Sequence, residues 1–184
     1  MRIAVIVAVA LCVTGSVAAQ RTVPWPDDAG GSGGFSARRL RGPVTVDGRT
    51  WIAAEVNVGR PDVWRPAKAD YQLRFTDPDE EGDFERWALM LERAGSQPVS
   101  LTAGGKTGFA YVTPDARFVF TEPLIVIDVR RWRRYALYIA LGIHPYVSID
   151  AISRDGHRLL LHRADCAVDC RQREVEYFEL TLPS

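Results

Sequence analysis

The sequence of 184 residues contains little lysine, cysteine or histidine and carries no net charge. Its 23 acidic residues balance 23 basic ones, of which 21 are arginine. A neutral chain has no overall field that would steer it toward nucleic acid or an anionic membrane surface, so we expect neither partner. The scarcity of lysine beside abundant arginine indicates a GC-rich genome and favours a bacterial origin.

The apolar stretch at the start of the sequence has two interpretations, a cleaved signal peptide and an uncleaved membrane anchor, and its length favours the first. A membrane-spanning helix needs about 20 apolar residues. The longest candidate starts after Arg2 and ends at Ala19, and it has only seventeen residues, among them polar ones and a glycine. One positive charge, an apolar run over residues 3–13 and small residues before Gln20 are typical of a secretory signal peptide. We therefore predict that residues 1–19 are cleaved off and that the mature protein is periplasmic or secreted.

The remainder has the length of one domain preceded by a short leader. Residues 20–42 consist mainly of Pro, Gly, Ser and Arg around a few apolar side chains. Such a segment has too little apolar surface to offset the entropy of ordering its backbone, so we expect a flexible leader there. Residues 43–184 are predicted to form a single β-rich globular domain.

Short apolar runs rich in Val, Ile, Tyr, Phe and Thr dominate this domain and predict β-strands. Asp-Gly at residues 47–48 and 155–156 supplies positive φ at low cost, and Pro-Asp at residues 114–115 suits a type I turn. Each pair is therefore expected to connect the two strands of a hairpin. Residues 124–127 are continuously apolar and are expected in a central strand. Further strands are predicted at residues 71–76, 135–141 and 175–182.

One segment, residues 83–94, has helical instead of alternating periodicity. Phe84, Trp87 and Leu91 recur at helical spacing, an aspartate at the start can cap the first turn, and Gly95 ends the helix. The predicted fold is therefore mainly β: an antiparallel β-sandwich or barrel with one covering α-helix. A chain of this size buries enough surface to fold without a cofactor, so none is expected.

The densest group of acidic residues leads into this predicted helix and has the spacing of the first half of a calcium loop. Asp77, Asp79, Glu81 and Asp83 place oxygen ligands at alternate positions. The twelfth position of such a loop requires a bidentate Glu, and here it is Ala88. Two interpretations stay open: acidic residues favoured by the dipole at a helix N-terminus, and a weak calcium site.

Two cysteines, Cys166 and Cys170, would remain after cleavage of the signal peptide. Thiols of exported proteins are usually oxidised, so a disulfide that closes a short turn is the first interpretation. With His162 the pair has the spacing H-x3-C-x3-C, and imidazole plus two sulfurs suits zinc or copper. A metal-binding or redox protein is therefore the alternative. The C-x3-C spacing resembles that of periplasmic copper-delivery proteins of the Sco family, a resemblance confined to the two cysteines.

A basic run interleaved with an aromatic residue lies between two predicted strands. It comprises Arg130, Arg131, Trp132, Arg133 and Arg134. Guanidinium and indole groups stack on one another and hold phosphate or carboxylate, which points to an anionic partner such as a polysaccharide or an envelope protein. The alternative is a solvated hairpin tip.

Motifs for nucleotide binding and acyl transfer are missing. The sequence Gly-Gly-Lys-Thr at residues 104–107 lacks the first glycine of a phosphate loop, because that position is Ser100, and no Gly-x-Ser-x-Gly elbow is present. Scattered carboxylates such as Asp128 and Asp150 leave a small secreted hydrolase open as a further alternative. The first expectation is a non-enzymatic domain that binds or scaffolds a component of the cell envelope, with its oligomeric state left open.

Overall fold

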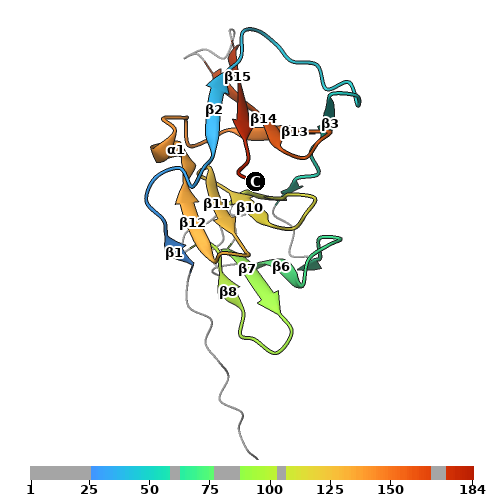
Figure 1. Ribbon diagram of the computed structural model, residues 1–184, viewed down its shortest axis with the longest axis vertical. Helices are drawn as coiled ribbons and strands as arrows, with labels where there is room; N and C mark the ends of the chain where they lie inside the picture. Colours follow the sequence, from blue (N-terminus) through green and yellow to red (C-terminus); the bar gives the residue numbers. More distant parts are fainter. Residues whose placement is uncertain (1–25, 59–62, 77–87, 103–106, 167–172) are drawn as a thin grey trace, which may run out of the picture.

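The part of the chain that the structure describes folds into three sheets and one helical turn, arranged as in Figure 1. A computed structural model describes residues 26–58, 63–76, 88–102, 107–166 and 173–184. The mainly β class predicted from the sequence is confirmed. In chain order the elements are β1 (Asp27–Asp28), β2 (Ser36–Arg39), β3 (Trp51–Ala53), β4 (Asn57–Val58), β5 (Val63–Trp64), β6 (Tyr71–Thr76), β7 (Ala88–Arg93), β8 (Val99–Ser100), β9 (Phe109–Val112), β10 (Phe118–Thr121), β11 (Ile125–Asp128), β12 (Arg133–Ala136), α1 (Leu137–Ala140), β13 (Ser148–Ser153), β14 (Arg158–Cys166) and β15 (Arg173–Thr181).

The strands form three open sheets. Sheet A has the order β1-β12-β11-β10-β9-β4, sheet B the order β2-β15-β14-β13-β3, and sheet C the order β5-β6-β7-β8. Neighbouring strands are antiparallel except β1 and β12, which are parallel. In Figure 1 sheet B lies at the top, sheet A in the middle and sheet C at the bottom. The arrangement is sandwich-like, and no barrel closes.

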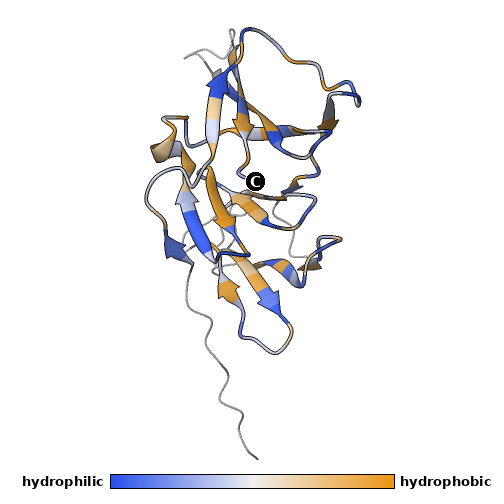
Figure 2. Ribbon diagram, in the orientation of Figure 1, coloured by the Kyte–Doolittle hydropathy of each residue, from blue (hydrophilic) through white to orange (hydrophobic). Residues whose placement is uncertain are grey.

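Sheet A is the central layer of the fold, and each of its two faces packs into an apolar core. Along β10, Phe118 and Phe120 pack into a core shared with sheet B, whereas Val119 packs into a core shared with sheet C. On the neighbouring β11, Val126 packs into the core shared with sheet B and Ile127 into the core shared with sheet C. A strand that is buried on both faces needs a continuous apolar run, which is the pattern that predicts a central strand here. Both strands are accordingly mostly orange in Figure 2.

Sheet C covers sheet A with its single apolar face. In β6, Tyr71, Leu73 and Phe75 are buried and alternate with exposed or half-buried polar residues. Its neighbour β7 buries Leu89 and Leu91 in the same alternation. These five side chains pack against residues of β9, β10 and β11. Sheet C is therefore amphipathic, with its polar face turned to solvent.

The prediction of a helix at residues 83–94 is wrong for the part of this segment that the structure describes. Ala88–Arg93 is strand β7, which pairs along its whole length with β6. Residues 83–87 lie outside the described residues. Leu89 and Leu91 fit an alternating pattern as well as a helical one. The backbone groups of β6 need a hydrogen-bonding neighbour, and that tertiary requirement decides in favour of a strand.

The helix that the described residues do contain is the single turn α1, which follows β12 directly. Residues 135–141, predicted as one strand, divide between the end of β12 and α1. Leu137 is fully buried, its N–H donates to the carbonyl of Leu124 at 3.1 Å, and its carbonyl accepts the N–H of Leu141 at 2.9 Å. These bonds turn the chain out of sheet A after Ala136. No helix in the described ranges has the length and apolarity needed to cross a bilayer.

The segment predicted as a flexible leader, residues 20–42, is part of the folded domain wherever the structure describes it. Strand β2 pairs with β15, and Phe35, which precedes β2, is only 2% exposed. The Phe35 ring centroid lies 5.1 Å from that of Phe118 and 5.9 Å from that of Tyr135. Gly33 permits this approach, because a Cβ at its position would collide with the Tyr135 ring. One large aromatic side chain thus anchors a glycine-rich segment whose composition predicts disorder.

Two of the three predicted hairpins are confirmed. Strands β9 and β10 are joined across residues 113–117, and β13 and β14 across residues 154–157. The third hairpin is wrong in its first half, because residues 44–46 form no strand. The Asp47 carboxylate instead accepts backbone N–H groups of the turn that precedes β3, for example that of Thr50 at 2.8 Å. The backbone of this turn is therefore held by hydrogen bonds to the side chain of Asp47 and not by pairing with a strand at residues 44–46.

Two buried tyrosines should make the fold sensitive to alkali. Tyr71 and Tyr111 are 2% and 3% exposed, and burial raises the pKa of both phenols. Tyr71 also donates a hydrogen bond to the carbonyl of Ala116 at 3.1 Å, which a phenolate cannot do. In the unfolded chain both phenols ionise near pH 10, whereas in the folded chain they stay protonated. We therefore expect the free energy of unfolding to fall above pH 10, by about 1.4 kcal/mol per pH unit for each residue.

Urea unfolding at a series of pH values below and above the ordinary tyrosine pKa measures this loss. The variant Tyr71→Phe keeps the ring and removes the ionisable group, so it should lose stability less steeply with rising pH. The exposed Tyr146 offers the matched control, since Tyr146→Phe should follow the wild-type curve. Equal slopes for Tyr71→Phe and the wild type would contradict the prediction.

Candidate functional site

A groove with a volume of about 670 Å³ lies between sheets A and B. This volume is within the range of small-molecule binding sites in proteins. Its walls are the β9–β10 turn at residues 113–118, the β13–β14 turn at residues 153–158, and residues 182–184 after β15. In Figure 1 the letter C marks this last segment, between the strands of sheet B and β10. Two hairpin tips from different sheets therefore meet at one cavity.

The β9–β10 tip is held by a threonine and an aspartate. The hydroxyl of Thr113 donates to the Asp115 carboxylate at 2.7 Å, and that carboxylate accepts the backbone N–H of Arg117 at 3.1 Å. The same hydroxyl oxygen accepts the backbone N–H of Phe118 at 3.0 Å. Side-chain hydrogen bonds thus satisfy the backbone donors of the turn and fix its shape.

The β13–β14 tip repeats this arrangement with a serine in place of the threonine. The Ser153 hydroxyl donates to Asp155 at 2.5 Å, Asp155 accepts the N–H of His157 at 3.0 Å, and Ser153 accepts the N–H of Arg158 at 2.9 Å. The Ser153 hydroxyl and the His157 N–H hold the pKa of the Asp155 carboxyl below its ordinary value. Gly156 supplies the positive φ of 76° that the turn requires. The shared pattern, Ser or Thr followed two positions later by Asp, is readable in the sequence.

A third hairpin tip, between β11 and β12, is fixed by the buried Asp128. This carboxylate is 1% exposed and accepts the backbone N–H groups of Arg130 and Arg131, both at 3.0 Å. Its second oxygen lies 3.2 Å from both Nε and Nη2 of Arg117. Asp128 therefore sets the position of two arginines that line the groove, Arg117 and Arg130.

The floor of the groove is apolar. Ile52 on β3 pairs in register with Ile152 on β13 and leaves 45% of its surface exposed. Phe118 and Leu182 complete the floor, and the Arg117 guanidinium lies 4.5 Å above the centre of the Phe118 ring. Ile52 therefore leaves apolar surface in contact with water, and a ligand that covers this surface gains binding free energy from the hydrophobic effect.

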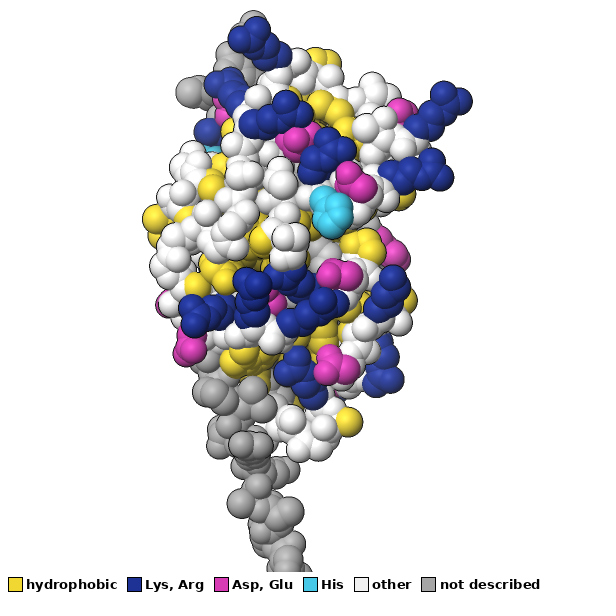
Figure 3. Space-filling model, in the orientation of Figure 1, with side chains coloured by type: hydrophobic (Ala, Val, Ile, Leu, Met, Phe, Trp, Pro, Cys, Tyr) yellow, Lys and Arg dark blue, Asp and Glu magenta, His cyan; other side chains and the backbone are white. Residues whose placement is uncertain are grey.

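The rim of the groove carries cations without partners among the described residues. Lys68 and Arg154 are exposed, and neither has an ion pair or a side-chain hydrogen bond with any described residue. Arg130 is 63% exposed and lies 3.6 Å from the Asp115 carboxylate. Figure 3 shows Lys and Arg side chains across the middle of this face, with hydrophobic side chains visible between them. The groove therefore presents these cations to solvent beside the two carboxylates of its lining, Asp115 and Asp155, whose side chains are 50% and 54% exposed.

The structure divides the predicted basic run instead of presenting it as one patch. Arg130 lines the groove, whereas Arg134 pairs with Asp28 of β1 at 2.8 Å. Trp132 is half-buried, with the guanidinium of Arg93 5.5 Å from the centre of its ring. The other two members, Arg131 and Arg133, are exposed.

Trp132 lies in the wall of a second hollow that adjoins the groove. This hollow, of about 570 Å³, shares Lys68, Asp115 and Arg130 with the groove. Trp132 has a φ of 53°. This left-handed conformation costs a non-glycine residue about 1–2 kcal/mol. Packing of the ring against Arg93 and the core beneath sheet C offsets that cost.

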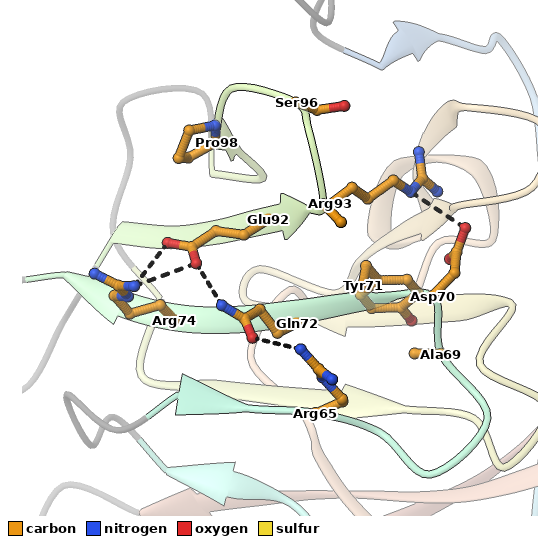
Figure 4. A pocket seen from close by; sticks show the side chains of 11 residues that line it. Arg65, Ala69, Asp70, Tyr71, Gln72, Arg74, Glu92, Arg93, Ser96 and Pro98 are labelled. Atoms are coloured by element: carbon orange, nitrogen blue, oxygen red, sulfur yellow. Dashed lines mark hydrogen bonds and ion pairs between the residues drawn. The ribbon is translucent and has the colours of Figure 1, made fainter.

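A further cavity, of about 590 Å³, lies on the polar face of sheet C and is lined by polar side chains that already bond to one another. Figure 4 shows Arg74 paired with Glu92, which also accepts a hydrogen bond from Gln72 at 2.7 Å. Gln72 in turn accepts one from Arg65 at 3.1 Å. Because these groups already have partners, the surface offers a ligand less than the groove does.

The predicted metal sites receive no support from the described residues, which hold no group of three or more His, Cys, Asp or Glu suited to a metal ion. His162 lies on β14, where its Nδ1 is 2.6 Å from Asp150 of β13. Strand β14 runs through Cys166, so four residues of extended backbone, about 13 Å, separate that cysteine from His162. Cys170 lies outside the described residues, so its disulfide stays a prediction. The predicted calcium ligands Asp77, Asp79, Glu81 and Asp83 also lie outside the described residues, so the calcium site stays a prediction as well.

The two carboxylates considered for a hydrolase do not meet. Asp128 ends β11 in sheet A, and Asp150 lies on β13 in sheet B. The acids that the groove does contain, Asp115 and Asp155, are engaged by the turn hydrogen bonds described above. A general acid needs a raised pKa, whereas the pKa of Asp155 is lowered.

The fold and the groove define a three-sheet β domain with a cavity between hairpin tips, which has apolar lining residues and two cations without partners among the described residues. Comparison with protein-family models, with curated proteins and with solved structures finds no match. The sequence gives no direct indication of Lys68, Arg154 or Ile52, because each lies far along the chain from the predicted basic run.

Proposed function

We propose that this chain is an exported, non-enzymatic domain that binds an anionic partner of the cell envelope in the groove between sheets A and B. The observation that carries the proposal is the pair of exposed cations, Lys68 and Arg154, on the rim of a cavity and without partners among the described residues. A cation held in a concave, partly apolar surface attracts anions more strongly than one on an open surface. Export rests on the predicted signal peptide at residues 1–19.

The state of the carboxylates in the groove favours binding over catalysis. Asp115 and Asp155 each accept a hydroxyl and a backbone N–H of their own turn. Their geometry is that of turn caps, in which the carboxylate oxygens hold the backbone of their own hairpin tips. The groove then acts through fixed charges and an apolar floor.

Retention on a sulfated polysaccharide resin tests the charge of the groove. The double variant Lys68→Gln/Arg154→Gln removes both unpartnered cations, and we expect it to elute at lower salt than the wild type. Exposed ion pairs typically contribute about 0.3–0.7 kcal/mol each, so the loss of two should lower the affinity roughly three- to tenfold.

A matched control removes two positive charges elsewhere. Arg41 and Arg49 are exposed and lie outside the groove, so Arg41→Gln/Arg49→Gln should elute as the wild type does. If both double variants lose retention equally, binding depends on total charge and the groove is not the site. If the wild type is not retained at all, the groove does not bind a polymeric sulfate.

A further inference from the structure

The groove offers an anion more than charge. Ile52 is 45% exposed on its floor, and Pro114 and Pro183 add apolar surface to its walls. These residues lie beside the two unpartnered cations, Lys68 and Arg154. Apolar surface and free positive charge therefore share one cavity of about 670 Å³.

A purely polar anion would leave the apolar part of this surface exposed to water. Solvent-exposed ion pairs are weak by themselves, because both partners are already well hydrated. Removal of apolar surface from water contributes more to the affinity than such ion pairs do. Walls formed by two hairpin tips and residues 182–184 bound the cavity on several sides, which favours a compact ligand over an extended polymer.

We infer that the ligand of the groove is a compact amphipathic anion: an acyl chain or aromatic ring that bears a single carboxylate, sulfonate or phosphate group. Its apolar body lies on Ile52 between the two hairpin tips, and its head group meets Lys68 and Arg154. This inference rests on the proposed function and adds the class of ligand to it.

Two fluorescent probes that differ in charge separate the two contributions. The probe 8-anilinonaphthalene-1-sulfonate carries a sulfonate on an aromatic body, and N-phenyl-1-naphthylamine has nearly the same body without charge. We expect the anionic probe to bind the folded full chain saturably, and the neutral probe to bind roughly tenfold more weakly. High salt should weaken only the anionic probe, because it screens the contribution of the head group.

Variants assign each contribution to its residues. Lys68→Gln/Arg154→Gln should weaken the anionic probe roughly three- to tenfold and leave the neutral probe unchanged. Ile52→Thr, which keeps a β-branched side chain on β3, should weaken both probes to a similar extent. Val63 on β5 is 49% exposed and lies outside the groove, so Val63→Thr is the matched control and should change neither. Each variant is compared after its unfolding temperature is shown to match that of the wild type, and Ile52→Val replaces Ile52→Thr if the latter is unstable.

The outcomes distinguish failure of this inference from failure of the proposed function. If the anionic probe depends on Lys68 and Arg154 but not on Ile52, the groove binds anions by charge alone, and the inference is overturned while the proposed function stands. If neither probe responds to any groove variant and the polysaccharide resin does not retain the wild type, both fail. Displacement of the anionic probe by decanoate or by 2-naphthoate, dependent on Ile52, supports the inference for a chain or a ring respectively.

Discussion

Replacement of Asp128 by alanine is expected to lower the free energy of unfolding by about 3–5 kcal/mol, because it leaves a mostly buried arginine without its counter-charge. The Arg117 side chain is only 11% exposed, and both of its short contacts to a carboxylate end on Asp128. Two backbone N–H groups, those of Arg130 and Arg131, lose their acceptor at the same time. Urea unfolding measures the loss.

Two further aspartate variants make the prediction specific. Asp128→Asn keeps an acceptor for the two backbone N–H groups and removes the charge, so its loss should lie between those of the wild type and the alanine variant. Asp150 also has one hydrogen-bonded partner, His162, but both side chains are more than a quarter exposed. Asp150→Ala should therefore cost about 1 kcal/mol or less. A similar cost for Asp128→Ala and Asp150→Ala would contradict the assigned role of Asp128.

The second large effect is expected at Phe35. Its side chain is 2% exposed and contacts the rings of Phe118, Phe120 and Tyr135. Truncation to alanine removes these ring contacts and opens a cavity in the core between sheets A and B, which should cost about 3–5 kcal/mol in urea unfolding. The loss should be accompanied by faster proteolysis near β2, since Phe35 anchors the glycine-rich segment from which that strand starts.

An exposed aromatic residue provides the comparison for Phe35. Tyr146 is 52% exposed, and Tyr146→Ala should change the free energy of unfolding by no more than about 0.5 kcal/mol. Phe35→Leu, which keeps much of the buried volume, should fall between the two. If Phe35→Ala were as stable as the wild type, residues before β2 would be a leader after all, as their composition predicts.

Much of the fold could be predicted because it depends on local patterns. The continuously apolar residues 124–127 indicate a strand that is buried on both faces, and all of them except Leu124, which lies in the preceding turn, belong to β11 at the centre of sheet A. The Pro-Asp and Asp-Gly pairs at residues 114–115 and 155–156 indicate turns, and both turns exist with their aspartates as caps. In each case the residues that decide the conformation are neighbours in the sequence.

Long-range pairing decided the parts that were predicted wrongly. The sequence of Ala88–Arg93 is compatible with a helix, and it is a strand because β6 lies beside it. The composition around Phe35 predicts disorder, and the segment is ordered because aromatic side chains from sheet A receive that ring. Local propensity is a weak preference of less than about 1 kcal/mol per residue, so tertiary contacts override it readily.

The candidate site likewise combines features that depend on neighbouring residues with features that depend on tertiary packing. The apolar alternation of the strands, the aspartate turns and the arginines at the β11–β12 tip can be read from the amino-acid order alone, because each depends on side chains within a few residues. That Arg130 shares a cavity with Lys68, Arg154 and Ile52, while Arg134 pairs with Asp28, follows from the packing of distant segments. A groove between two sheets depends on which hairpin tips meet in space, and that is settled by the packing of whole layers.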